Sequence, residues 1–196
     1  VPVQGNHDMG KDYEMYFPLP RDSKMVTPNG DFCVDYGLVR MLVLNDSRSS
    51  ADRLLADRLL WLSERLAEAS NQWRVVAMHG PMYSSGMHGG GGSRGVEQAL
   101  IAGKVHAVFA GHDHHYERTK PQSGITHFVT GGGGAPLRAL DAKPGSFSAK
   151  AAAVHHFMAV DANKERMAIK VYEVTDSRKT PLLDSVEIPW DCQWEK

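Results

Sequence analysis

Along the chain, short apolar runs of strand length alternate with one long amphipathic segment. Residues 32–37 and 38–45 (FCVDYG and LVRMLVLN) are rich in β-forming side chains and meet at Gly37, which predicts a hairpin or two adjacent strands. The opening residues, VPVQ, have the pattern of the end of a strand. Further strands are predicted from apolar or alternating runs at 73–79, 105–111, 125–130, 154–162, 166–174 and 182–188.

The long segment at 50–69 has the pattern of a helix. Its apolar face is formed by leucines at spacings of three and four, namely Leu55, Leu59, Leu62 and Leu66, and Ser49 or Ser50 is the candidate cap. A glycine-rich loop at 86–95 and a brief helix around 96–102 follow, whereas 11–30 is predicted as loop with one short helical turn at most. Strands and helices in this order, followed by a run of strands, favour an α/β core with antiparallel strands added toward the end.

Composition narrows the class of protein. With 196 residues and 42% hydrophobic side chains, the chain is long enough for a single domain, which we place at 1–196. The formal net charge of −1 gives no basic field, so nucleic acid is not an expected partner. No apolar stretch is long enough to span a membrane. Cys33 and Cys192 are far apart in sequence, which leaves open a disulfide or two buried thiols.

Polar residues follow three of the apolar runs. They are Asn6 in GNHD, His79 at the end of VVAMH, and His112 and His114 in GHDHHYER. Groups at the carboxyl ends of strands in an α/β sheet meet at one edge, and amide oxygen and imidazole nitrogen are good ligands for Zn, Mn and Fe. Each residue alone also fits a hydrogen-bonded structural role, and a turn at His112 would separate it from His114. The joint pattern favours a metal site.

These motifs resemble a known family. GNHD, VVAMH and GHDHHYER are similar to the last three of the five motif blocks of calcineurin-like metallophosphoesterases, and GHDHHYER with TGGGGAPL resembles the purple acid phosphatase branch. The resemblance covers residues 2–137, and more weakly 154–188. It implies an α/β fold of the metallophosphoesterase type, a β-sandwich flanked by helices, and hydrolysis of small-molecule phosphate esters, most of all monoesters. It also favours an exported protein, secreted or periplasmic.

The family uses two divalent or trivalent metal ions (Fe, Zn or Mn) and in-line attack by a metal-bound hydroxide. Carried over by motif, Asn6, His79 and His112 would bind one ion and His114 the other. His7 would contact the phosphate or protonate the leaving oxygen. Asp8 would hold His7 or a metal ligand in place, and His88 would contact substrate.

The same resemblance implies structural roles nearby. Tyr116, Glu117 and Arg118 would form a clamp after the ligands. The glycines at 131–134 are not a nucleotide-binding loop, because no Lys-Ser or Lys-Thr follows, and they would let the backbone pass close to the site.

The family's first two motif blocks, which carry its aspartate ligands, have no match in this sequence. Asp31 and Asp35 lie in similar short patterns, but after GNHD, so we reject them as replacements. We therefore expect a truncated domain that lacks its amino-terminal strands, holds at most one ion and is inactive alone. An unpaired sheet edge could then favour self-association. The alternatives are a non-catalytic module or half-domain that needs a partner chain, and a phosphodiesterase with the same metal site.

Overall fold

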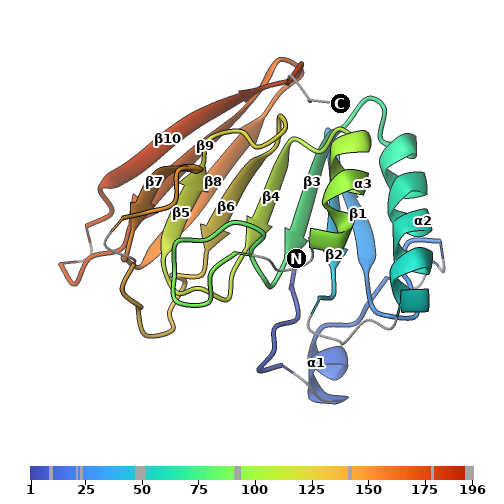
Figure 1. The fold of residues 1–196 in the computed structure, drawn as a ribbon, viewed down its shortest axis with the longest axis horizontal. Helices are drawn as coiled ribbons and strands as arrows, with labels where there is room; N and C mark the ends of the chain where they lie inside the picture. The colour runs from blue at the N-terminus through green and yellow to red at the C-terminus, as the bar shows by residue number, and fades with distance from the viewer. Residues whose placement is uncertain are drawn as a thin grey trace.

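The computed structural model describes residues 1–8, 11–20, 22, 24–46, 52–90, 94–140, 143–177 and 179–192. Two β-sheets pack face to face, and two helices cover the other face of the larger sheet (Figure 1). The helices are α1 (Lys11–Tyr16), α2 (Asp52–Glu68) and α3 (Glu97–Ala102), with a 3-10 turn at Arg94–Val96. The strands are β1 (Phe32–Tyr36), β2 (Val39–Leu44), β3 (Trp73–Met78), β4 (Ala107–Ala110), β5 (Tyr116–Thr119), β6 (Thr126–Thr130), β7 (Ser148–Ala152), β8 (His156–Ala162), β9 (Arg166–Glu173) and β10 (Leu182–Pro189).

The larger sheet has seven strands in the order β1-β2-β3-β4-β6-β5-β7. Its centre is parallel, because β2, β3, β4 and β6 pair in the same direction. Their carboxyl ends therefore share one edge, and the amino-terminal segment lies beside it (Figure 1). β1 and β2 form the predicted hairpin, and Gly37 turns it with a φ of 55°.

Two strands of this sheet were not predicted. β5 begins inside the GHDHHYER motif, and β7 has the sequence SAKAA with no buried residue. Both add antiparallel strands beyond β6, where partners rather than apolar pattern define a strand. The expectation for the opening residues was wrong, since 1–5 form no strand. The candidate cap residues Ser49 and Ser50 lie outside the described residues.

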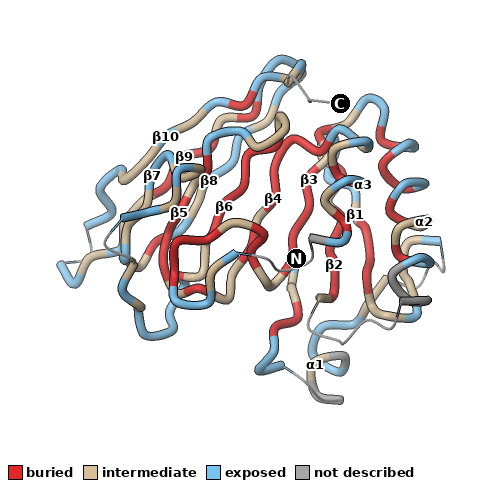
Figure 2. The backbone as a smooth tube through the Cα atoms, in the orientation of Figure 1, coloured by how far each residue is buried: buried red, intermediate tan, exposed pale blue. Residues whose placement is uncertain are grey.

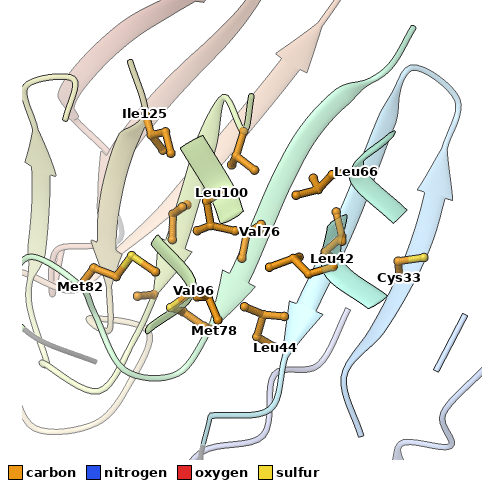
Figure 3. Close-up of a cluster of buried hydrophobic side chains, with 14 residues drawn as sticks. Cys33, Leu42, Leu44, Leu66, Val76, Met78, Met82, Val96, Leu100 and Ile125 are labelled. Atoms are coloured by element: carbon orange, nitrogen blue, oxygen red, sulfur yellow. The ribbon is translucent and has the colours of Figure 1, made fainter. Parts of the chain in front are cut away.

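The main core lies between the helices and the larger sheet. Leu66 of α2 and Leu100 of α3 are fully buried against alternate residues of the central strands (Figure 3), and Leu62 of α2 belongs to the same buried cluster. Side chains of a strand alternate between faces, so Leu42 and Leu44 point to this core while Val43 belongs to the opposite face. Figure 2 shows buried positions concentrated on the central strands and on one side of α2.

The smaller sheet, in the order β10-β9-β8, covers the other face and completes the sandwich. Tyr116 and Arg118 fasten the two sheets together, because the Tyr116 hydroxyl and Arg118 Nε each donate to Asp184 at 2.8 Å. Burial alone would raise the pKa of Asp184, but these two hydrogen bonds hold it below its usual value. Glu117, between them in sequence, faces the helix side and accepts from Ser85.

The aspartates rejected as metal ligands hold ion pairs. Asp31 is fully buried, and its carboxylate lies 2.9 Å from Arg58 Nη2. Asp35 lies 2.7 Å from Arg40. Both cysteines are free thiols, Cys33 buried and Cys192 half-buried, so the structure favours two thiols over a disulfide.

The edge strand β8 exposes apolar surface. Phe157 is 46% exposed and Val160 50% exposed. Such an edge suits pairing with another chain, and self-association there stays a prediction. No helix within the described ranges is long and apolar enough to cross a membrane.

Candidate metal and phosphate site

Three of the predicted residues meet at the carboxyl edge of the central strands. Asn6 Oδ1 lies 2.8 Å from His79 Nε2, and His112 Nδ1 lies 2.9 Å from the same nitrogen. Asn6 comes from the amino-terminal segment, His79 follows β3 and His112 follows β4. The parallel arrangement of β3 and β4 explains why residues 33 positions apart meet here.

His79 is positioned by Asp46, a residue that sequence reasoning missed. The two oxygens of Asp46 accept the backbone N–H groups of His79 (2.9 Å) and Gly80 (2.7 Å). Asp46 follows β2 as His79 follows β3, and that shared position is the signal that could have found it. Gly5 must also be glycine, because a Cβ there would lie 2.8 Å from the His79 ring.

Asp8 holds the turn that carries Asn6 and His7. Its carboxylate accepts the Gly5 N–H at 2.9 Å, and its own N–H donates to the Gly5 carbonyl at 3.1 Å. Gln4 anchors the turn to the sheet, since its side chain joins the Asp8 carbonyl and the Asn45 amide. His7 is exposed beside this anchored turn. Asp8 therefore acts on the backbone that presents Asn6 and His7.

His114 does not join the cluster of Asn6, His79 and His112. The chain turns at His112, whose φ is 61°, so the segment is not extended. Burial lowers the His79 pKa most, and His114 acts on the cluster as one of the charges that lower this pKa further. His114 Nδ1 lies 2.8 Å from the Pro136 carbonyl. Gly131 allows the glycine segment to pass close to the backbone of Asp113, because a Cβ at 131 would lie 2.1 Å from the Asp113 carbonyl oxygen. The glycine segment thus passes close to the site, as predicted.

The loop bearing His88 is fastened by buried Asp113. One oxygen of Asp113 accepts the His88 N–H at 3.2 Å, and the other accepts the Ser84 hydroxyl at 2.5 Å. The His88 ring is exposed and stands 4.3 Å, centroid to centroid, from the His112 ring. Sequence reasoning named His88 but not Asp113, which lies between the two candidate ligands in the sequence and accepts from Ser84 and the His88 N–H.

A substitution at Gly86 tests how tightly Asp113 holds the loop that bears His88. A Cβ at Gly86 would lie 2.7 Å from both Asp113 Cγ and His115 Cε1, two side chains that are fully buried. We expect Gly86→Ala to displace the loop and to cost about 1–3 kcal/mol of stability, as overpacking does. Gly133→Ala is the matched control, since a Cβ there meets nothing within 4 Å. Equal melting temperatures for the two variants, measured by circular dichroism, would contradict the tight packing of this loop.

The electrostatics favour neutral imidazoles in the cluster. Burial is the largest influence on His79 and lowers its pKa, although Asp46 and Asp8 act in the opposite direction. Burial also lowers the pKa of His112, and the neighbouring His79 and His88 add to the effect. Neutral imidazole is the form that binds metals.

The donor atoms fit a metal ion. Asn6 Oδ1, His79 Nε2 and His112 Nδ1 all carry lone pairs, and one imidazole proton cannot satisfy both contacts of His79 Nε2 well. Two ligands bound at about 2.1 Å and at right angles lie about 3.0 Å apart, close to the separations seen. Within the described part of the chain, no group of three or more His, Cys, Asp or Glu could hold an ion, so the set depends on the asparagine.

Comparison with known proteins agrees with the motifs. The family model described as calcineurin-like phosphoesterase matches residues 1–116. The chain belongs to this family. The sandwich described above is the fold that the calcineurin-like phosphoesterase resemblance implied.

Curated relatives point to one branch of the calcineurin-like phosphoesterases. A phosphoenolpyruvate phosphatase of Allium cepa is 38% identical over 85 residues, which are 40% of this chain and 18% of the relative. Purple acid phosphatase 22 of Arabidopsis thaliana is 30% identical over 156 residues, 67% of this chain and 36% of the relative. The chain therefore spans about a fifth to a third of the length of these relatives.

A solved structure supports the fold. The purple acid phosphatase PPD1 of yellow lupin (Lupinus luteus) seeds superposes with a TM-score of 0.70 at 21% identity, over 82% of this chain and 33% of that one. The expected metallophosphoesterase fold is thereby confirmed.

Proposed function

We propose that this chain carries the phosphate-handling part of a metal-dependent phosphomonoesterase of the acid phosphatase kind. The observation that carries the proposal is the convergence of Asn6, His79 and His112 on one point at the sheet edge. Similarity to purple acid phosphatases supports the substrate class. An ion held by these three residues would supply Lewis-acid polarisation of a phosphate ester.

The chain's own residues divide the work. His7, exposed in the turn next to Asn6, would contact the phosphate or give a proton to the leaving oxygen as a general acid. His88, exposed beside His112, would contact the phosphate from the other side. Asp8 would keep His7 in place through the turn that it closes.

The donor set also suggests that the centre is incomplete. Asn6, His79 and His112 offer three neutral donors to one ion, whereas His114 offers a single imidazole to a second. Divalent ions at hydrolytic sites usually have three or more protein ligands. We propose that the chain alone retains at most one ion of Fe, Zn or Mn and turns over poorly without further carboxylate donors.

Metal content and hydrolysis, measured together, test this function. The chain would be loaded separately with Zn²⁺, Mn²⁺ and Fe²⁺, desalted, and analysed for ions per chain by mass spectrometry. Hydrolysis of p-nitrophenyl phosphate and bis(p-nitrophenyl) phosphate would be assayed on the same samples. We expect one ion per chain rather than two, with any turnover favouring the monoester.

Each other result excludes part of the proposal. Two tightly held ions with rapid turnover would show a complete enzyme and refute the proposal that the metal centre is incomplete. Preference for the diester would favour a phosphodiesterase. No retained ion of any kind would refute the metal role of the cluster and favour a non-catalytic module.

A further inference from the structure

Arg138 lies beside the site at the end of the loop that follows the glycine segment. Its backbone N–H donates to the His114 carbonyl at 3.2 Å, and the His114 ring in turn lies 2.8 Å from the Pro136 carbonyl. The loop is therefore joined twice to the histidine motif. Arg138 lies just past residue 137, where the family resemblance ends, so no motif assigned it a role.

The Arg138 guanidinium contacts a histidine whose ring lies against the cluster. Nη1 contacts His88 Nε2, and the His88 ring packs on His112. The positive charge of Arg138 is one of the influences, after burial, His79 and His88, that set the His112 pKa below its usual value. The cation is thus within electrostatic reach of the residues that gather at the sheet edge.

The partner of this guanidinium is unusual. Within the described ranges no ion pair joins Arg138 to a carboxylate, and its side-chain contact is the exposed His88 ring. Because a guanidinium only donates hydrogen bonds, His88 Nε2 must accept here. In contrast, Arg40, Arg58 and Arg118 each have a carboxylate partner. A half-buried cation with a weak, exposed partner is ready to bind an anion.

We propose that Arg138 is a substrate-binding residue that exchanges its contact with His88 for two terminal oxygens of a phosphate monoester. The inference rests on the proposed function. The guanidinium fork matches two oxygens of one phosphate with two parallel N–H···O hydrogen bonds. One terminal oxygen must face the histidine cluster, so a monoester leaves two for Arg138 and a diester leaves one. Arg138 therefore also favours monoesters over diesters.

Binding of inorganic phosphate to the metal-loaded chain, measured by isothermal titration calorimetry, tests the assignment. Arg138→Met should weaken phosphate binding at least about tenfold, because charge-assisted hydrogen bonds are lost. Arg138→Lys should recover part of the affinity, since it keeps the charge without the fork. Arg166→Met, on β9 of the smaller sheet, removes the same charge and should bind like the wild type. Ion content should be equal in all four proteins.

A second comparison separates direct contact from support of His88. If Arg138 contacts phosphate itself, Arg138→Met should weaken binding in a His88→Ala background too. The preference for methyl phosphate over dimethyl phosphate should fall in Arg138→Met and persist in His88→Ala. Unchanged phosphate affinity of Arg138→Met, with a wild type that binds phosphate, would overturn the role of Arg138 and leave the proposed function standing. A wild type that binds neither ion nor phosphate would overturn both.

Discussion

Replacing His79 by alanine should weaken metal binding by two orders of magnitude or more. His79 Nε2 is the atom to which both Asn6 Oδ1 and His112 Nδ1 are close, so its loss separates all three donors. Loss of an outer partner of a metal ligand already costs about 10–100-fold in affinity, and loss of a ligand should cost more. Competition with a chromophoric chelator such as Zincon gives the affinity directly.

The His79→Ala variant should remain folded, so a change in metal affinity can be assigned to the lost imidazole. The His79 backbone is fixed by β3 and by Asp46, and the alanine keeps both. His155→Ala is the matched control, because His155 contacts the Gly132 carbonyl and is outside the cluster. At position 112 the φ of 61° makes asparagine a better replacement than alanine, since asparagine tolerates left-handed backbone. Unaltered affinity in both His79→Ala and His112→Asn would refute the ligand assignment.

The meeting of His79 and His112 could be anticipated because it follows from topology, whereas Asn6 was named from its motif and follows no strand. Apolar runs of strand length marked β2, β3, β4 and β6, and parallel strands bring their carboxyl ends to one edge. Apolar pattern failed for β5 and β7, which are strands because β6 offers an edge to pair with. The sequence therefore predicted β1 and the centre of the sheet better than the margin beyond β6.

Supporting residues were harder to predict, because they depend on contacts between loops. Asp113 lies inside a recognised motif, yet its role comes from Ser84 and His88, which only the folded chain brings to it. Arg138 depends in the same way on how its loop folds over His114. The turn at His112, which sets the direction of the chain before His114, could not be predicted from the spacing of the two histidines alone.

Replacing Arg58 by methionine should destabilise the fold by about 3–5 kcal/mol, the cost of leaving a buried charge without its partner. Arg58 Nε and Nη2 both lie within 3.0 Å of the Asp31 carboxylate, which is fully buried. At roughly 2–4 °C per kcal/mol for a chain of this size, the melting temperature should fall by roughly 10 °C. Thermal unfolding followed by circular dichroism measures the change.

Removing the charge of the unpaired Asp31 carboxylate should restore part of the lost stability. Asp31→Asn keeps an oxygen for the Asn45 N–H but is neutral, so it should stabilise the Arg58→Met protein while destabilising the wild type. The same sign in both backgrounds would contradict a buried ion pair. Arg58 also donates to the Asn45 carbonyl, immediately before Asp46. Asp46 in turn holds the backbone of His79, so the Arg58–Asp31 pair supports the metal-binding edge. Arg58→Met should therefore release bound metal at temperatures below its unfolding transition.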